Sequence, residues 1–192
     1  RTKQALLRAG IELIAEEQTD LSILAITQKA GVSNGSFYNF FKDRTQFFDA
    51  VAEYAVNNLA SIFDLAADQD LDSIDAAAMN IRILAYAHRL VPTLSKSIVR
   101  RSPDFYTMPN ELVRKLRERI NAGVNDGSFH VASTETAAAI FFGANAMLGQ
   151  RLHEDPTLNS RTAGDDLALD LLRMLGVSEE RALQAIARPI DD

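Results

Sequence analysis

Residues Ser22 to Arg44 read SILAITQKAGVSNGSFYNFFKDR, and this stretch decides how the rest of the chain is interpreted. It predicts two short helices joined by a tight turn. Ser22 is a good N-cap for the first helix, because its hydroxyl can accept an otherwise unpaired backbone N–H. Gly31 can adopt the left-handed conformation that ends this helix, and Ser33 is placed to cap the second. The pattern is typical of a helix-turn-helix, whose second helix can lie in the major groove of DNA.

The second helix carries a polar surface that suits contact with a duplex. Phe37 and Phe41 lie four residues apart and are expected to form its core side. The other faces carry side chains that can reach phosphate oxygens or base edges, namely Asn34, Ser36, Tyr38 and Asn39. The alternative is an ordinary helical corner, whose aromatic residues are core and whose polar residues are only solvated.

The sequence from Ala30 to Phe41, AGVSNGSFYNFF, is followed by Arg44 and Phe47. It resembles the DNA-binding domain of the tetracycline-repressor (TetR) family of bacterial transcriptional regulators. In that family an Ala-Gly-Val-Ser turn precedes a short recognition helix and then a long fourth helix. The resemblance covers roughly residues 1 to 50. Beyond them the family keeps only an all-helical plan, so the resemblance does not identify a ligand.

Four positions depart from the family pattern. Arg44 stands where Lys is usual and keeps the positive charge. Ser36 stands where Thr is usual and keeps the hydroxyl, whereas Thr27 replaces a small Ala in the first helix of the motif. Gln18 occupies the place where a Gly commonly ends the preceding helix, and the connection from there to Ser22 is one residue short.

The resemblance implies that the chain binds a palindromic double-stranded DNA operator as a homodimer, with the two recognition helices about one helical turn apart. Tyr38 and Arg44 are then expected to contribute affinity through phosphates, and Asn34 and Asn39 to contribute specificity through base edges. The complete set of candidate DNA-binding residues is Ser22, Ser33, Asn34, Gly35, Ser36, Phe37, Tyr38, Asn39 and Arg44.

The composition limits the class of protein. The chain has 192 residues, enough for one large or two small domains with a substantial core. It contains no Cys, which excludes disulfides, thiolate metal sites and cysteine nucleophiles. No apolar run reaches the ~20 residues that span a bilayer, and no signal-peptide pattern is present. A cytoplasmic protein without membrane association is therefore expected, and a short leader is expected to precede Arg1, because the sequence does not begin with Met.

The net charge of −6 is unusual for a protein that binds nucleic acid, but the charge is unevenly distributed. Residues 1–44 carry six Lys or Arg and five Asp or Glu, and the remainder carries fourteen and twenty-one. The N-terminal part is thus near +1 and the rest near −7. Any surface that faces DNA has to be local.

The hydrophobic spacing predicts an all-α fold, with a three-helix head that contains the helix-turn-helix and a body of roughly six helices. By the resemblance, the body serves ligand binding and dimerisation. The predicted domains are residues 1–46 and 47–192. An aromatic loop is expected over residues 102–109 and a polar loop over residues 155–162. Helices are expected over residues 2–17, 23–30, 34–41, 43–67, 73–91, 93–101, 110–125, 133–154 and 165–175, with a last one after residue 178.

By the resemblance, the homodimer forms through the last long helices, residues 133–154 and 165–175. Small residues in the first and a leucine stripe in the second fit an apolar interface. The alternative is that both stripes fill the core of one protomer. The resemblance also implies a small apolar or amphipathic effector, which binds among the body helices and releases the DNA.

Candidate ligand-binding residues are the aromatic, amide and long apolar side chains of the body, namely Met79, Asn80, Ile83, Tyr86, His88, Phe105, Tyr106, Phe141, Phe142 and Asn145. A stripe of Met and aromatic residues at helical spacing is also the pattern of an ordinary core. Asn80 and Asn145 are more informative, because a buried amide needs hydrogen-bond partners that a ligand can supply.

No motif predicts an enzyme, a metal site or a cofactor. His88, His130 and His153 are scattered, and none shares a helix face with a carboxylate at metal-ligand spacing. The sequence has no Gly-rich phosphate loop and no nucleophile elbow. We therefore expect a TetR-like repressor that a ligand releases from its operator. The alternative is an all-helical small-molecule-binding or interaction protein whose head no longer binds an operator.

Overall fold

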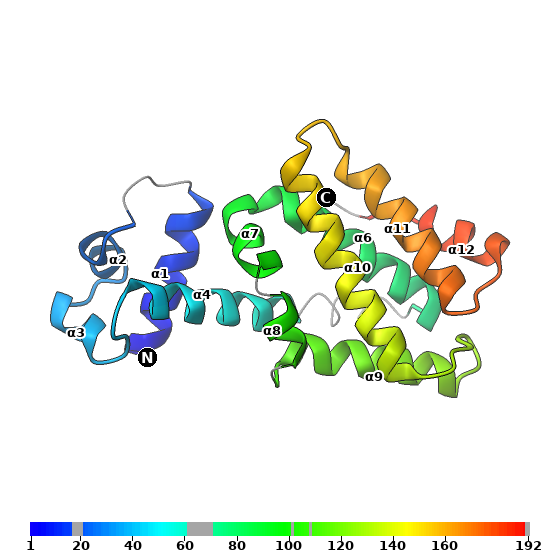
Figure 1. Cartoon of the computed structure of the whole chain (residues 1–192), viewed down its shortest axis with the longest axis horizontal. Helices are drawn as coiled ribbons and strands as arrows, with labels where there is room; N and C mark the ends of the chain where they lie inside the picture. The colour runs from blue at the N-terminus through cyan, green and yellow to red at the C-terminus, as the bar shows by residue number, and fades with distance from the viewer. Residues whose placement is uncertain (17–20, 61–70, 101, 108, 191–192) are drawn as a thin grey trace.

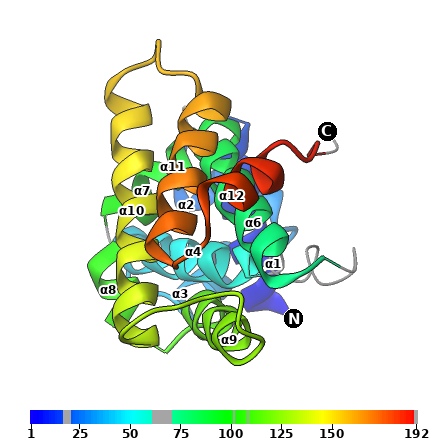
Figure 2. The ribbon, with the colours of Figure 1, turned by 90° about the vertical axis from the view of Figure 1, so that its right-hand side faces the viewer.

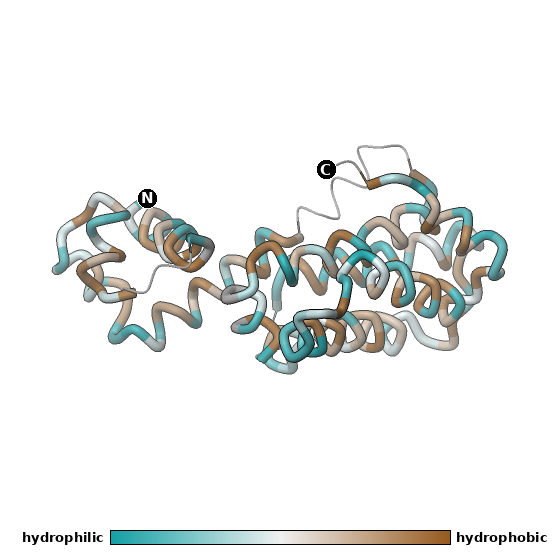
Figure 3. The backbone as a smooth tube through the Cα atoms, turned by 90° about the horizontal axis from the view of Figure 1, so that it is seen from above, coloured by the Kyte–Doolittle hydropathy of each residue, from teal (hydrophilic) through white to brown (hydrophobic). Residues whose placement is uncertain are grey.

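The computed structural model describes residues 1–16, 21–60, 71–100, 102–107 and 109–190, and all regular structure in these ranges is helical. The predicted all-α class is confirmed. Figure 1 shows a small head of three helices at one end and a larger helical body at the other. Seen from above, the two lobes lie along the long axis of the molecule (Figure 3). None of the helices in the described ranges combines the length and apolarity that crossing a bilayer requires.

The head contains α1 (Thr2–Ala15), α2 (Ile23–Lys29) and α3 (Asn34–Tyr38). Ser22 caps α2 as predicted, since its Oγ accepts a 3.2 Å hydrogen bond from the backbone N–H of Ala25. Gly31 has a φ of 66°, which confirms the predicted left-handed turn between α2 and α3. The predicted irregularity at Gln18 lies outside the described residues.

The start of α3 differs from the prediction in one detail. Ser33 occupies the N-cap position, but its side chain accepts no backbone N–H. Its Oγ lies instead 2.9 Å from Oγ of Ser36. The two hydroxyls therefore satisfy each other across the first turn of the helix, and Ser33 is not the side-chain cap that the sequence predicted.

The helix α4 (Arg44–Leu59) connects the head to the body (Figure 1). Asp43 caps it, because its Oδ1 accepts a 2.9 Å hydrogen bond from the backbone N–H of Gln46. Val51 is buried in the core of the head, whereas Val56 is buried in the core of the body. The predicted domain boundary after residue 46 lies in the first turn of this shared helix, and the predicted continuation to about residue 67 falls outside the described residues.

Seven described helices form the body, namely α6 (Ser73–Leu90), α7 (Pro92–Arg100), α8 (Ser102–Thr107), α9 (Glu111–Asn125), α10 (Thr134–Glu154), α11 (Ser160–Met174) and α12 (Glu179–Ile186). Two predictions about loops are wrong. Residues 102–107 form α8, which buries Phe105 in the core. The helix α11 begins at Ser160 rather than at residue 165, because the Asn159 side chain accepts the backbone N–H groups of two residues in its first turn.

The central helix of the body is α6, against which α7, α9, α10, α11 and α12 all pack (Figure 2). Its interior side is made of small and branched residues such as Ala78, Ile81 and Ala85, which have no exposed surface. The leucine stripe of α11 packs into the same core, where Leu171 and Leu172 are buried. These two leucines therefore fill the core of one protomer, which was the alternative to a place in the dimer interface.

Two charged residues of α6 are also buried, and both connect it to the C-terminal part of the chain. Asp75 Oδ2 lies 2.8 Å from Nη2 of Arg188, and its Oδ1 lies 2.8 Å from Nη2 of Arg181 at ion-pair distance without hydrogen-bond geometry. Arg82 donates from Nε to Asp165 Oδ1 at 2.6 Å and from Nη1 to the carbonyl oxygen of Arg188 at 2.8 Å. This cluster fixes α11, α12 and the segment after it to α6.

Replacing the buried carboxylate tests the contribution of this cluster to stability. Asp75→Asn removes the charge shared by two arginines, and we expect it to lower the free energy of unfolding by about 1 to 3 kcal/mol. Asp170→Asn is the control, because the Asp170 side chain is 75% exposed and its pair with Arg173 is 3.5 Å long. That change should stay within about 0.5 kcal/mol. Urea unfolding measures the free energy of unfolding of both variants. Equal losses would contradict a specific contribution of the Asp75 cluster to stability.

Candidate functional site

The short helix α3 presents the predicted DNA-reading surface at the tip of the head, far from the body (Figure 1). Asn34, Gly35 and Asn39 are exposed, and Tyr38 is 58% exposed. The ring of Tyr38 packs edge-on against Phe37, with ring centroids 5.5 Å apart. The packed ring therefore holds the tyrosine hydroxyl outward, a position that suits a contact to a phosphate.

The inclusion of Phe37 among the DNA-binding residues is wrong. Its side chain has no exposed surface, and its ring lies 5.4 Å from that of Phe41 and 5.3 Å from that of Phe47. A fully buried ring cannot touch a duplex. Phe37 instead joins α3 to the start of α4 and holds the exposed residues of α3 in place.

The first residue of α4 supplies a cation beside α3. Arg44 is exposed, and its guanidinium lies 5.8 Å from the ring centroid of Phe48. Because the N-terminus of a helix disfavours a positive charge, the position of this arginine favours a role outside the helix. Its fork of donors suits a phosphate. Lys42 is exposed beside it, and Lys3 places its Nζ 5.9 Å from the ring centroid of Phe41.

The remaining predicted head residues have local partners of their own. Ser22 is half-buried and already caps α2, while Ser33 and Ser36 pair with each other. The hydroxyls of Ser33 and Ser36 can each still take part in one further hydrogen bond. Lys42 was missed as a candidate, although a lysine two residues from Arg44 is the kind of local charge that phosphate binding needs.

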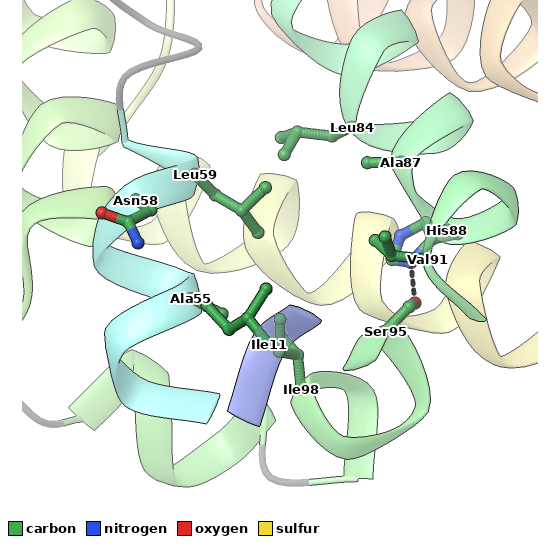
Figure 4. Close-up of a pocket in the computed structure, with 10 residues that line it drawn as sticks. All are labelled: Ile11, Ala55, Asn58, Leu59, Leu84, Ala87, His88, Val91, Ser95 and Ile98. Carbon is green, nitrogen blue, oxygen red and sulfur yellow. Dashed lines mark hydrogen bonds between the residues drawn. The ribbon is translucent and has the colours of Figure 1, made fainter. Parts of the chain in front are cut away.

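A cavity of about 320 Å³ lies between the head and the body (Figure 4). Its lining comes from α1, α4, α6, α7 and the residue between the last two, namely Ile11, Ala55, Asn58, Leu59, Leu84, Ala87, His88, Val91, Ser95 and Ile98. A second cavity of about 60 Å³ adjoins it and shares Leu59, Leu84, His88 and Ile98. Helices α7 to α10 complete the lining of this smaller cavity, including Phe141, Phe142 and Asn145.

Four of the predicted ligand-binding residues line these two cavities, namely His88, Phe141, Phe142 and Asn145. Asn80 lines a separate cavity of only about 20 Å³. Met79 and Ile83 pack with Leu71 in another cluster. Tyr86 packs against Leu148 and Leu152 and lies beneath the guanidinium of Arg161.

The last two predicted ligand-binding residues also lie outside the lining of both cavities. Phe105 is buried in the main core, and the hydroxyl of Tyr106 donates to Glu135 Oε1 at 2.8 Å. Sequence reasoning missed the aliphatic lining residues such as Ile11, Leu59 and Leu84. Their spacing is that of any core helix, so no signal in the sequence separates a cavity wall from a filled interior.

A chain of hydrogen bonds crosses one wall of the larger cavity. His88 Nδ1 lies 2.6 Å from Ser95 Oγ (Figure 4), and this oxygen lies 2.9 Å from Nε2 of His153. The backbone carbonyl of Asn145 faces the ring of His88 from α10. These hydrogen bonds thus connect α6, α7 and α10 through the buried Ser95 and two half-buried histidines.

His88 approaches α10 closely because position 149 is a glycine. A Cβ atom at Gly149 would lie 2.5 Å from Cε1 of His88 and 2.8 Å from Cγ2 of Val99. Burial, together with the neighbouring His153, lowers the pKa of His88 to about 4, although the carbonyl of Asn145 opposes this. The pKa of His153 is also lowered, by burial and by Lys96 and Arg89. At neutral pH the imidazole of His88 is therefore uncharged.

Both parts of the chain match models of known protein families. A model described as bacterial regulatory proteins, tetR family, matches residues 6–51. A model described as tetracyclin repressor-like, C-terminal domain, matches residues 72–188. The chain belongs to the TetR family. It is accordingly a transcriptional regulator, and the resemblance that begins at Ala30 is confirmed.

Individual TetR relatives support this assignment over almost the whole chain. The HTH-type transcriptional regulator BetI of Proteus mirabilis is 28% identical over 194 residues, which cover 98% of this chain and 76% of BetI. Among solved structures, RolR in complex with resorcinol has a TM-score of 0.78 at 24% identity and covers 100% of this chain and 95% of RolR. FadR of Bacillus subtilis in complex with stearoyl-CoA has a TM-score of 0.60 at 16% identity, over 89% and 98% of the two chains. The two structures show a shared TetR fold.

The lowered pKa of His88 gives this TetR protein a specific acid sensitivity. Unfolding returns the imidazole to its ordinary pKa of about 6.5, so the unfolded chain binds more protons between that value and 4. The stability that the neutral ring contributes is complete above pH 6.5 and is lost as the pH falls towards 4. As the pH falls from 7 to 5, we expect the free energy of unfolding of His88→Gln to decrease by about 2 kcal/mol less than that of the wild type. The exposed His130→Gln should behave as the wild type, and a parallel loss in all three proteins by urea unfolding would contradict this account.

Proposed function

We propose that this TetR-family regulator is a repressor, that it binds a palindromic operator as a homodimer in the bacterial cytoplasm, and that a small apolar or amphipathic effector releases it. The position of the larger cavity carries the proposal. Its lining joins Ile11 of α1 and Ala55 of α4 to His88 of α6 and Ile98 of α7 (Figure 4). An occupant would therefore touch the head and the body at once.

Contact with both lobes is what coupling requires. A ligand shifts an equilibrium between two arrangements only by the difference in its affinity for them. In the cavity, that difference arises where α1 and α4 meet α7, because an occupant that separates these helices changes the angle of the head. The complexes of RolR with resorcinol and of FadR with stearoyl-CoA support an effector in a protein of this fold.

The operator contacts divide by chemistry. The exposed hydroxyl of Tyr38 and the guanidinium of Arg44 serve as phosphate contacts, which fix register and affinity. The amides of Asn34 and Asn39 serve as base contacts, because an Asn side chain can pair with an adenine edge. A protein whose head has lost operator binding is not favoured, because the chain keeps the exposed polar face of α3 and the match to the TetR head.

The outward face of α10 supports the dimer. Ile140 is 45% exposed and Met147 is 60% exposed, and Ala139 and Gly143 of the same helix are also exposed, with positions 139, 143 and 147 at helical spacing. A Cβ atom at Gly143 would meet nothing within 4 Å, so this face admits a closely packed neighbour. Together with the outer side of α11, this α10 face would form the interface between protomers.

Selection of bound duplexes from a random library at about 0.15 M salt tests operator binding. We expect a palindromic consensus for the wild type. Tyr38→Ala should weaken binding to all duplexes. Tyr38→Phe keeps the ring on Phe37 and removes only the hydroxyl, so its affinity gives the contribution of the hydroxyl to binding. Asn39→Ala should lower discrimination at one base position by roughly 1 to 3 kcal/mol. An equal loss at every sequence for Asn39→Ala would refute its role in base recognition, and a wild type that selects no sequence would refute the function.

Placing a charge on the α10 face tests the dimer. Met147→Glu puts a carboxylate into the proposed apolar interface on both sides of the two-fold axis, so we expect mostly monomer at micromolar concentration by sedimentation equilibrium. Leu183→Glu is the control, because Leu183 is 46% exposed on α12. It should leave the dimer intact. Dissociation of the Leu183 variant alone would move the interface to α12.

A further inference from the structure

Asn145 lines the smaller of the two joined cavities and carries a buried hydrogen-bond acceptor that is not used. The residue is 7% exposed and lines this cavity from α10. Its Nδ2 donates a 3.1 Å hydrogen bond to the carbonyl oxygen of Phe141. Only the amide nitrogen can donate to a carbonyl, so this bond fixes which amide atom is the oxygen. The oxygen, Oδ1, is buried and has no partner among the described residues.

The polar side chains beside the cavities are paired with one another. His88 Nδ1 lies 2.6 Å from Ser95 Oγ, and this oxygen lies 2.9 Å from Nε2 of His153. Asn145 Oδ1 is not part of this series and keeps no partner among the described residues. A buried acceptor without a partner costs about 1 to 3 kcal/mol, which a ligand that donates a hydrogen bond would recover.

The charge and size of the joined cavities restrict the ligand further. With His88 neutral, no described residue that lines either cavity carries a formal charge. A carboxylate or a phosphate bound there would lose its hydration without gaining a counter-charge. The larger cavity, of about 320 Å³, matches the liquid volume of about ten waters. That volume suits a compact ligand better than a long acyl chain.

We propose that the effector is a compact, uncharged alcohol or phenol of roughly ten non-hydrogen atoms, whose hydroxyl donates a hydrogen bond to Asn145 Oδ1. Its apolar part fills the larger cavity between the head and the body. The hydroxyl passes between Leu84, His88 and Ile98, which both cavities share, and reaches the smaller one. This inference rests on the proposed function, because it takes the larger cavity as the effector site.

Three matched probes test the required hydroxyl on the full-length dimer without DNA. 4-Ethylphenol is neutral and donates a hydrogen bond, 4-ethylanisole keeps the ring, the ethyl group and the oxygen but has a methyl group in place of the hydroxyl hydrogen, and 4-ethylbenzoate is charged. We expect calorimetric titration at pH 7.5 to show that the phenol binds about ten-fold more tightly than the ether, which corresponds to about 1.4 kcal/mol. The benzoate should bind no more tightly than the ether. Tighter binding of the benzoate or of octanoate, or no binding by any probe, would overturn the inference.

Two buried asparagines make a matched pair of variants. Asn145→Leu removes the acceptor at similar volume, so the phenol and the ether should then bind with affinities within about two-fold of each other. Asn80→Leu is the control, because Asn80 is also buried with an unpartnered Oδ1 but lines the separate small cavity. It should keep the full preference for the phenol. A ten-fold preference for the phenol over the ether that survives in Asn145→Leu would overturn the inference. If a variant does not fold, the probe series on the wild type still tests whether binding needs the hydroxyl.

The two levels of the proposal fail in different ways. If a probe releases the selected operator but the hydroxyl makes no difference, the cavity remains the effector site and only the class of ligand is wrong. If the phenol binds with the expected preference and the operator stays bound at saturation, the hydrogen bond to Asn145 stands. The proposed release of DNA from that cavity is then wrong.

Discussion

The structure depends on a single helix that belongs to two hydrophobic cores. Val51 and Ala55 of α4 are buried with the head, while Ala52 and Val56, one position further along, are buried with the body. The two stripes lie side by side on the same turns, so neither lobe can rotate about α4 without disturbing its own core. The lobes approach each other again where α7 contacts α1 and α4. The larger cavity lies at this second contact, where the packing is incomplete.

The local features of the head could be predicted because they depend on single residues. Ser22 caps α2 and Gly31 takes the left-handed turn, as their chemistry requires. The two expectations for Phe37 conflicted, because its spacing from Phe41 placed it on the core side of the helix while its polar neighbours placed it among the DNA-binding residues. Only the rings of Phe41 and Phe47 around it show that it is core.

In the body, the sequence predicted the helices well and the cavity poorly. Capping residues and periodicity are local, whereas an empty volume is the result of what several helices fail to fill. The sequence analysis found Asn145 because an amide is unusual in an apolar helix. It missed the aliphatic residues of the cavity wall because such residues are usual in any core helix. Ser95 gave no signal either, since its role depends on two histidines that lie 7 and 58 positions away along the chain.

The ion pairs that join α6 to the end of the chain also set an order of events during synthesis. Arg82 donates to the carbonyl oxygen of Arg188, which lies 106 positions further along the chain. The two partners of Asp75, Arg181 and Arg188, are likewise close to the end of the sequence. While the chain emerges from the ribosome, the carboxylate of Asp75 has no counter-charge and remains better solvated outside a core. The central helix of the body can thus be fully enclosed only after nearly the whole chain has been made. The head can form earlier, since the described residues of its core lie between positions 6 and 55, with Val91 and Ile98 at its edge.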